Sequence, residues 1–207
     1  MNQTIRPAAV SLLVFTVLCG LVYPLAIDGI AAAVFPHQAT GSLITDRSGK
    51  VVGSELIGQP FDNPAYFWSR LTAQANYDAS SSTGTNQGQS GFVDDKGHLG
   101  ANPALVKSAK DRLFALRAAD PGNTAPVPVD LVTSSGSGLD PHISPAAALY
   151  QVGRVARERG QPRAAIQELV EEHIEERTLG ILGERRVNVV RLNRALDDRF
   201  GPPKPNG

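Results

Sequence analysis

The stretch from Val127 to Pro145, VPVDLVTSSGSGLDPHISP, decides the fold of this chain. An apolar run, Val129 to Thr133, leads into a Ser/Gly loop at residues 134 to 138 and then to Ser144-Pro145. A serine followed by proline is typical of an N-cap and the first residue of a helix. We therefore expect a buried strand at Val129 to Thr133, a tight loop, and a helix from Pro145 to Arg159.

Similar signals on either side of this stretch predict further elements. We expect a β-hairpin with strands at Ser42 to Thr45 and Val51 to Ile57, joined by a polar turn that contains Gly49. Apolar periodicity and capping residues predict three more helices and one short strand. These lie at Asn102-Pro103 to about Ala119, at about Pro162 to Arg177, around Val187 (the strand) and at Asn188 to Phe200. Helices and strands in this mixture predict an α+β domain.

The N-terminal part carries no charged residue from Ala8 to Ile27. These ~20 residues, at a rise of ~1.5 Å each, match the ~30 Å hydrocarbon core of a bilayer. We therefore expect one transmembrane helix at residues 8–28, closed by Asp28 and disturbed in its last turn by Pro24. A short tail at residues 1–7 precedes this helix, and a connector at residues 29–39 follows it.

Other interpretations of this apolar segment are weaker. Ala31-Ala32-Ala33 suggests a cleaved signal peptide, but the apolar region exceeds the usual ~7–15 residues and only Arg6 precedes it. A lipoprotein signal ending at Cys19 would require a small residue where Leu18 stands. A buried core helix would be apolar along one stripe, whereas this segment is apolar on all faces. After the connector we expect one soluble domain at residues 40–200 and a disordered tail at residues 201–207.

Composition excludes several classes of protein. The 207 residues suffice for one membrane segment and one domain. The 20 basic and 20 acidic residues balance, so there is no basic excess to bind the phosphates of a nucleic acid. The single cysteine, Cys19, excludes an intramolecular disulfide and a cysteine-based zinc cluster.

Chemistry is most plausible between Ser134 and Ser144, where a Gly/Ser loop precedes a helix N-terminus. Free N–H groups and the helix dipole can cradle an anion there, although a tight structural turn explains the same pattern. The lysine of a P-loop is missing, and Gly136-Ser137-Gly138 lacks the spacing of a nucleophile elbow. His173 lies among glutamates without a metal-ligand spacing. We expect neither a catalytic residue nor a metal site.

Three motifs together resemble the KdpC family of potassium-transporting ATPase subunits over nearly the whole chain. They are YFWSR at Tyr66 to Arg70, the stretch quoted first, and VNVVRLNRALD at Val187 to Asp197. The sequence departs from the family pattern at residues 81–88 and through an insertion near residues 87–100. The positions that carry the resemblance are Tyr66, Phe67, Trp68, Ser69, Arg70, Asp130, Asp140, Pro141, Ser144, Asn188 and Asn193.

The resemblance implies a non-catalytic accessory subunit of an ATP-driven potassium uptake complex, needed for assembly and for the activity of the ATP-hydrolysing subunit. It implies three protein partners: a channel-like potassium-binding subunit, the P-type ATP-hydrolysing subunit and a small single-span subunit. It also implies a cell-membrane location with a cytoplasmic N-terminus and an extracytoplasmic domain. Charge counting does not decide this orientation, because Arg6 on one side is matched by Arg47 and Lys50 on the other.

The resemblance further implies that the subunit raises the ATP affinity of its catalytic partner by sharing a nucleotide. The residues that could contact this nucleotide are Ser134, Ser135, Gly136, Ser137, Gly138 and Gln151. An extracytoplasmic domain meets no ATP, however, so a structural role over the potassium entrance of the channel-like subunit is an open alternative. A membrane-anchored binding module, or a tether unrelated to ATP use, is the competing class.

Overall fold

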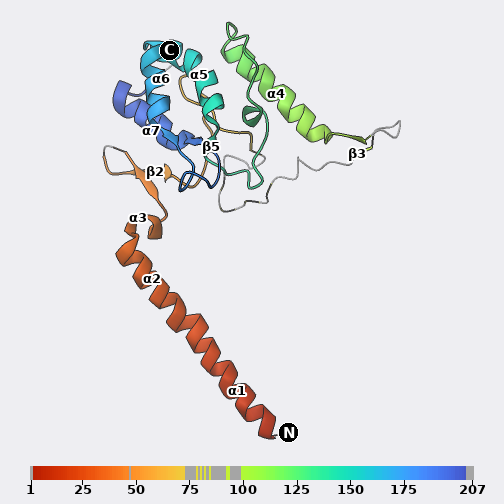
Figure 1. Ribbon diagram of the computed structural model, residues 1–207, viewed down its shortest axis with the longest axis vertical. Coiled ribbons are helices and arrows are strands. Elements are labelled where there is room, and N and C mark those ends of the chain that lie inside the picture. The colour runs from red at the N-terminus through yellow and green to blue at the C-terminus, as the bar shows by residue number, and fades with distance from the viewer. Residues whose placement is uncertain are drawn as a thin grey trace. The chain divides into compact units, whose positions relative to one another are not determined.

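The structure of the chain, a computed structural model, describes residues 2–46, 48–72, 92–93 and 99–203, together with residues 78, 80, 82 and 84 (Figure 1). The chain divides into two compact units, Met1–Val52 and Gly53–Gly207, which are described separately. Our predictions for residues 81–88 and for the insertion near residues 87–100 lie largely outside the described residues. So does the expected disorder of residues 204–207.

The first unit is dominated by a long helix, shown at the N-terminal end in Figure 1. Its parts are α1 (Asn2–Val17), the π-helical turn η1 (Leu18–Val22) and α2 (Tyr23–Val34), followed by the short α3 (Pro36–Ala39). The continuous stretch Thr4–Val34 is long and apolar enough to cross a membrane, as expected. It runs past Asp28, because the wider turn before Pro24, with Tyr23 N–H bonded to Leu18 O, admits the proline without ending the helix.

The predicted hairpin is present as β1 (Leu43–Thr45) paired with β2 (Val51–Ser54). Asp46 organises its turn, because one carboxylate oxygen accepts hydrogen bonds from the N–H groups of Ser48 (2.8 Å) and Lys50 (2.9 Å). The second strand is shorter than predicted. The Ser54 hydroxyl accepts the N–H of Leu56 at 3.1 Å, which turns the chain where the sheet would otherwise continue.

In the described part of the second unit there are four α-helices, and the two predicted N-caps, Asn102 and Ser144, begin two of them. These helices are α4 (Pro103–Ala119), α5 (Pro145–Arg159), α6 (Arg163–Glu172) and α7 (Val189–Phe200). The side chains of Asn102, Ser144 and Asn188 accept N–H groups in the first turns of α4, α5 and α7. Helix α6 is shorter than predicted and ends at Glu172, because the next residues join a sheet.

That sheet has the order β5-β7-β6, with both neighbouring pairs antiparallel. Its strands are β5 (His142–Ile143), β6 (Ile174–Glu175) and β7 (Arg186–Asn188). Val187 at the centre faces Ile143 on one side and Ile174 on the other. A separate pair, β3 (Phe92–Val93) with β4 (Leu99–Gly100), precedes α4. Together with the helices, these strands confirm the α+β class.

The strand predicted at Val129 to Thr133 is wrong. Val129–Leu131 form one turn of 3-10 helix, η4, in which Leu131 is fully buried and Val129 is 71% exposed. Local bonds explain the difference. Val129 O accepts hydrogen bonds from the N–H of Val132 (3.1 Å) and from the hydroxyl of Thr133 (2.9 Å). An apolar run this short carries no periodicity that distinguishes a strand from a helical turn.

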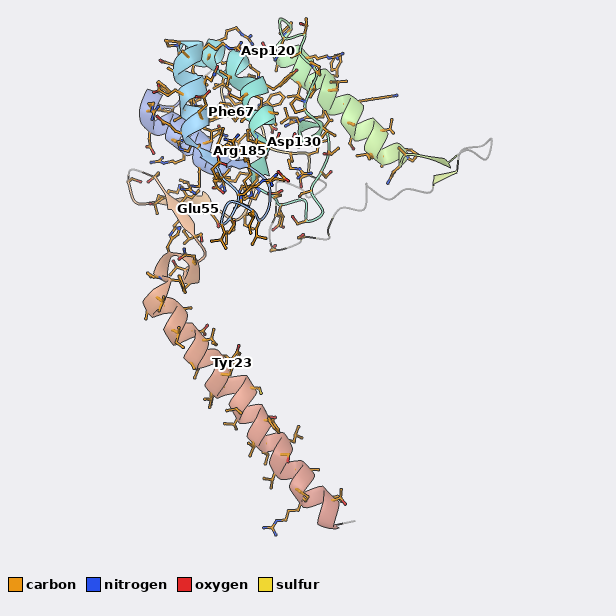
Figure 2. The ribbon with its side chains drawn as sticks, in the orientation of Figure 1. Tyr23, Glu55, Phe67, Asp120, Asp130 and Arg185 are labelled. Carbon is orange, nitrogen blue, oxygen red and sulfur yellow. The ribbon has the colours of Figure 1, made fainter. Side chains whose placement is uncertain are left out.

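The core of the second unit lies where α5, α6 and α7 pack on the three-stranded sheet. Phe67 lies among these helices with no exposed surface (Figure 2). Burying a side chain of this size stabilises a fold by ~1.5–3 kcal/mol. The other large apolar residues of this core with at most 2% exposure are Leu116, Leu131, Ile143, Val152, Val155, Ile166, Leu169, Val170, Val187, Val189, Leu192 and Leu196.

Candidate functional site

The YFWSR segment crosses the core as an extended chain without a neighbouring strand, and buried side-chain amides take the place of that strand. Phe67 N–H donates to Asn193 Oδ1 and Phe67 O accepts from Asn193 Nδ2, both at 2.9 Å. Trp68 N–H donates to Gln151 Oε1 at 2.8 Å, and Trp68 O accepts from Gln151 Nε2 at 3.1 Å. Two successive residues thus have their backbone groups satisfied by α7 and α5, as a buried backbone requires.

Arg154 extends this clamp. It lies one turn after Gln151 on α5 and donates to Gln151 Oε1 at 2.6 Å. It also donates to the carbonyl oxygens of Pro64 and of Tyr66, the latter at 2.9 Å. Burial, followed by the positive charge of Arg112, lowers the pKa of the Arg154 guanidinium to about 10. These hydrogen bonds satisfy a charge in an otherwise apolar core.

Two arginines enclose the ring of Trp68. The guanidinium carbons of Arg112 and Arg154 lie 4.7 Å and 4.6 Å from the ring centroid, within the range of cation–π attraction. Arg112 also donates to Ser69 O at 2.7 Å. The Ser69 hydroxyl donates to Gln59 O at 3.3 Å. Helices α4 and α5 therefore contact both the Trp68 side chain and the backbone of the segment.

Tyr66, the first residue of the segment, is held by contacts with helices α5 and α7. Its hydroxyl donates to Asp197 Oδ2 at 2.7 Å, and Arg159 lies 4.5 Å from its ring centroid while pairing with Asp197 at 2.8 Å. Burial, together with the hydrogen bond to Asp197 and that residue's charge, raises the pKa of the Tyr66 hydroxyl. The role of these residues in the site is thus to fix the segment in place.

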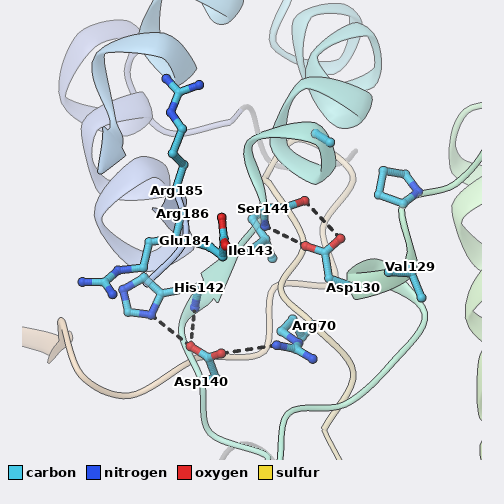
Figure 3. A pocket seen from close by; sticks show the side chains of 12 residues that line it. Arg70, Val129, Asp130, Asp140, His142, Ile143, Ser144, Glu184, Arg185 and Arg186 are labelled. Atoms are coloured by element: carbon cyan, nitrogen blue, oxygen red, sulfur yellow. Dashed lines mark hydrogen bonds and ion pairs between the residues drawn. The ribbon is translucent and has the colours of Figure 1, made fainter. Parts of the chain in front are cut away.

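At its end, the segment delivers Arg70 to a polar cleft of about 700 Å³ (Figure 3). Asp140 lies between two positive or hydrogen-bonding groups there: Arg70 Nη1 at 3.4 Å, and His142, whose Nδ1 and backbone N–H lie 2.9 Å and 3.0 Å away. Burial raises the pKa of the Asp140 carboxyl, but the hydrogen bonds from His142 and the charges of His142 and Arg70 outweigh it. The net pKa is lowered. The residues that line the cleft are Arg70, Pro128, Val129, Asp130, Asp140, His142, Ile143, Ser144, Ala146, Glu184, Arg185 and Arg186.

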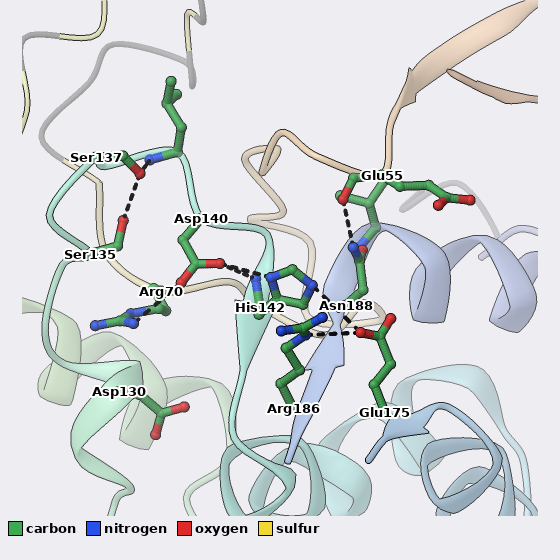
Figure 4. A network of polar contacts seen from close by, with 12 residues as sticks. Glu55, Arg70, Asp130, Ser135, Ser137, Asp140, His142, Glu175, Arg186 and Asn188 are labelled. Atoms are coloured by element: carbon green, nitrogen blue, oxygen red, sulfur yellow. Dashed lines mark hydrogen bonds and ion pairs between the residues drawn. The ribbon is translucent and has the colours of Figure 1, made fainter. Parts of the chain in front are cut away.

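The polar network continues from His142 across the sheet (Figure 4). His142 Nε2 lies 4.0 Å from Glu175 Oε2. Glu175 pairs with Arg186 at 2.9 Å and with Arg191 at 3.3 Å. These contacts join strands β5, β6 and β7 to helix α7.

Asn188 and Pro141 stabilise the same region. Asn188 caps α7 with its oxygen and donates its Nδ2 to Glu55 O at 2.7 Å. Pro141 O accepts Val189 N–H at 2.9 Å. Within the part of the chain that the structure describes, no three His, Cys, Asp or Glu side chains are grouped to hold a metal ion.

The N-terminus of α5 already holds an anion that belongs to this chain. The Asp130 carboxylate accepts the N–H of Ser144 at 2.6 Å and its hydroxyl proton at 3.1 Å. The Ser144 oxygen in turn accepts Ala147 N–H at 3.1 Å. A carboxylate at this position complements the helix dipole. The helix N-terminus that could cradle an anion is thus bonded to Asp130, as Figure 3 shows.

In the Ser134–Gly138 loop, the hydroxyls of Ser135 and Ser137 bond to the loop and to the residue that follows it. Ser135 Oγ accepts Gly138 N–H at 2.9 Å, and Ser137 Oγ accepts Leu139 N–H at 3.1 Å. Gly138 has a φ of 70°, which favours glycine. Around the loop, Arg70 donates to Ser134 O at 3.1 Å. These contacts agree with the tight structural turn that we kept as the alternative to an anion cradle.

The structure separates the predicted nucleotide residues into two places. Ser134, Ser135, Gly136, Ser137 and Gly138 form the loop, whereas Gln151 is 1% exposed and makes four hydrogen bonds in the core. Apart from Pro141 and Asn188, which bond at the start of α7, the family-motif residues fall into two groups. Those from Tyr66 to Ser69, with Asn193, form the clamp; Arg70, Asp130, Asp140 and Ser144 surround the cleft.

Sequence reasoning missed Arg112 and Arg154. The signal was weak but present for Arg154, which stands among Val152, Val155 and Ala156 on the apolar face of α5. An arginine on such a face indicates a buried charge with partners elsewhere in the fold.

Fold and site together define an α+β domain organised around a clamped extended segment and a polar cleft, in a chain with one helix able to cross a membrane. The chain belongs to the family described as "K+-transporting ATPase, c chain", whose model matches residues 5–198. This confirms the resemblance that its motifs indicate. The family makes the chain one of the subunits of a potassium-transporting ATPase, with partner subunits in a membrane complex.

Named relatives agree over nearly the full length. The protein called potassium-transporting ATPase KdpC subunit in Methylococcus capsulatus is 54% identical over 194 residues, which cover 93% of this chain and 96% of that protein. Its namesake in Sorangium cellulosum is 55% identical over 195 residues, with the same coverage. That of Polaromonas naphthalenivorans is 54% identical over 199 residues, covering 95% of each chain.

Proposed function

We propose that this chain is the non-catalytic accessory subunit of its potassium-transporting ATPase, and that it supports assembly and the activity of the ATP-hydrolysing subunit through protein contacts. Its N-terminus is cytoplasmic and its α+β domain extracytoplasmic. The observation that carries the proposal is the occupation of the α5 N-terminus by Asp130, at 2.6 Å from Ser144 N.

An anion site requires N–H groups that are free to meet the ligand. Here Asp130 supplies a negative charge at that place, and Ser135 and Ser137 accept N–H groups of their own loop. A phosphate group would have to displace these internal partners or lie beside a carboxylate of the same sign. The arrangement favours a rigid scaffold over a chemical site of its own.

The partners of this scaffold are the channel-like potassium-binding subunit, the P-type ATP-hydrolysing subunit and a small single-span subunit. The helix Thr4–Val34 packs in the bilayer, and the extracytoplasmic domain lies over the potassium entrance of the channel-like subunit. Potassium is the ion that the complex transports. No nucleic acid takes part.

The shared-nucleotide mechanism remains a distinct proposal with a different expectation. In it, Ser134 to Gly138 and Gln151 contact an ATP bound to the catalytic subunit and raise its affinity. The internal bonds of Gln151 and Ser135 weigh against it, because a nucleotide contact through either side chain would require a buried hydrogen bond to be given up.

The test uses the whole complex in membrane vesicles, with the chain intact or without residues 40–207. We expect potassium uptake and potassium-stimulated ATP hydrolysis to be lost without the domain. Full activity without the domain would contradict the proposal and leave the chain a membrane tether. Purification of the chain alone, free of polytopic subunits, would favour a separate binding module.

Nucleotide contact is tested separately by photolabelling the intact complex with azido-ATP. We expect label on the ATP-hydrolysing subunit and none on this chain. Label on residues 134–138 that disappears in Ser137→Ala, but persists in the exposed control Ser48→Ala, would support the shared nucleotide instead.

A further inference from the structure

The segment between β6 and β7 is a two-stranded ribbon with a tightly built tip. Thr178 and Leu182 exchange both backbone hydrogen bonds at 2.9 Å, and Gly180 N–H donates to Arg177 O at 2.9 Å. We call residues 179–182, Leu-Gly-Ile-Leu, the ribbon tip. The N–H groups of Gly180, Ile181 and Leu182 are bonded within the turn, which gives the tip a defined conformation.

The ribbon tip exposes large apolar side chains to solvent. Leu179 is 85% exposed, Ile181 75% and Leu182 58%. Single exposed apolar residues are common on protein surfaces, but three within four residues form a concentrated apolar surface. Such surfaces in a soluble domain mark contacts with other molecules.

The conformation of Leu179 adds an independent observation. Its φ is 56°, in the left-handed region that glycine occupies easily and leucine does not. The two glycines nearby, Gly180 and Gly183, have φ values of 76° and 78°. The chain therefore keeps a leucine side chain at a position where glycine would relieve strain, which points to a use for that side chain.

We call residues 175–177 and 184–186, which flank the ribbon tip, the stem. The charged side chains of the stem pair with one another. Its three cross-strand ion pairs are Glu175–Arg186 at 2.9 Å, Glu176–Arg185 at 2.8 Å and Arg177–Glu184 at 2.5 Å. Three acidic and three basic residues cancel within the stem. Each basic residue of the stem is thus engaged by a carboxylate, which leaves no cluster of cations beside the tip for anionic lipid headgroups.

We propose that the ribbon tip inserts into an apolar socket on a protein subunit of the same ATPase complex, with Leu179 and Ile181 as its anchors. A protein socket suits a preformed, uncharged apolar tip because little conformational freedom is lost on binding. Glu184, Arg185 and Arg186 of the stem also line the polar cleft, so the partner surface that receives the tip continues along it (Figure 3). This inference rests on the proposed function, since it assumes that the domain works within the complex.

Site-specific crosslinking in the intact complex tests the contact directly. Cys19 is the only cysteine, so Cys19→Ser removes it and Ile181→Cys then carries a benzophenone maleimide. We expect illumination of native membranes to join the chain to one of the other subunits, as identified by mass spectrometry. The matched control is Phe114→Cys on α4, with a similar exposure of 77%. Equal crosslinking from both positions, lipid adducts alone, or no adduct from Ile181→Cys would overturn the proposal.

Binding is tested with Leu179→Ser/Ile181→Ser against Phe114→Ser. We expect at least tenfold less chain to remain with the other subunits after detergent extraction, while the control retains the wild-type amount. Leu179→Gly separates side chain from backbone: we expect it to raise the melting temperature of the free chain and still to weaken retention. If every tip variant remains with the other subunits in the wild-type amount, the inference is wrong. If removal of residues 40–207 still abolishes transport in that case, the proposed function stands without it.

Discussion

The side-chain amide of Gln151 holds the backbone of Trp68 from both sides, accepting its N–H at 2.8 Å and donating to its carbonyl oxygen at 3.1 Å. The two residues lie 83 positions apart in the chain. Asn193 does the same for Phe67, the preceding residue. Helices α5 and α7 are thereby tied to one extended segment, whose last residue, Arg70, forms part of the polar cleft.

Gln151→Leu should destabilise the domain strongly. The substitution leaves the N–H and carbonyl of Trp68 unpaired in the core, and each such group costs ~1–3 kcal/mol. We expect the free energy of unfolding to fall by about 2–5 kcal/mol in denaturant titrations of the full chain. Gln167→Ala on the exposed face of α6 is the control and should change it by less than ~0.5 kcal/mol. A stable Gln151→Leu protein with reduced ATP affinity in the complex would instead favour a nucleotide role.

Removal of the Asp130 carboxylate should weaken the start of α5. Asp130→Ala deletes two hydrogen bonds to Ser144 and a negative charge at a helix N-terminus. Charged hydrogen bonds contribute ~1.5–3 kcal/mol, so we expect a loss of about 2 kcal/mol by thermal or chemical unfolding. Asp111→Ala, which breaks an exposed ion pair with Lys107, should cost less than ~1 kcal/mol. Equal losses in the two variants would contradict the capping role.

The free energy of unfolding should depend on pH because of the Asp140 carboxyl. Its folded-state pKa lies below the ordinary value of 3.8, so the unfolded chain binds a proton more readily. The stability that the carboxylate contributes is therefore complete above pH 3.8 and is lost as the pH falls through the folded pKa. We expect unfolding curves of wild type and Asp140→Asn to differ near neutral pH and to converge as the solution becomes strongly acidic. A difference that stays constant with pH would show that the charge of Asp140 is irrelevant.

The proposed orientation has a direct check in whole cells. In a Cys19→Ser background, we expect Phe114→Cys to react with a membrane-impermeant maleimide in intact spheroplasts. Thr4→Cys, at the N-terminal end of the apolar helix, should react only after lysis. The reverse pattern would place the domain in the cytoplasm and restore its access to ATP.

Local signals predicted much of the secondary structure. Asn102 and Ser144 begin two helices where their capping side chains indicate, because a cap acts within a few residues of the chain. The same reasoning failed at Val129 to Thr133 and at the end of α6. In the latter case Ile174 pairs with Val187, and a contact across the sheet overrides helical periodicity.

By itself, the sequence determined the apolar helix, the helix starts, the α+β class and the family, since these depend on composition, spacing and motifs within short stretches. Only the tertiary structure decided what the polar motif residues do. Gln151 and Asn193 bond to Trp68 and Phe67 across 83 and 126 residues, and Asp130 bonds to Ser144 where the sequence allowed either an anion cradle or a tight turn. Burial forces each polar group to find a partner, and which partner it finds depends on packing between segments that are distant in the chain.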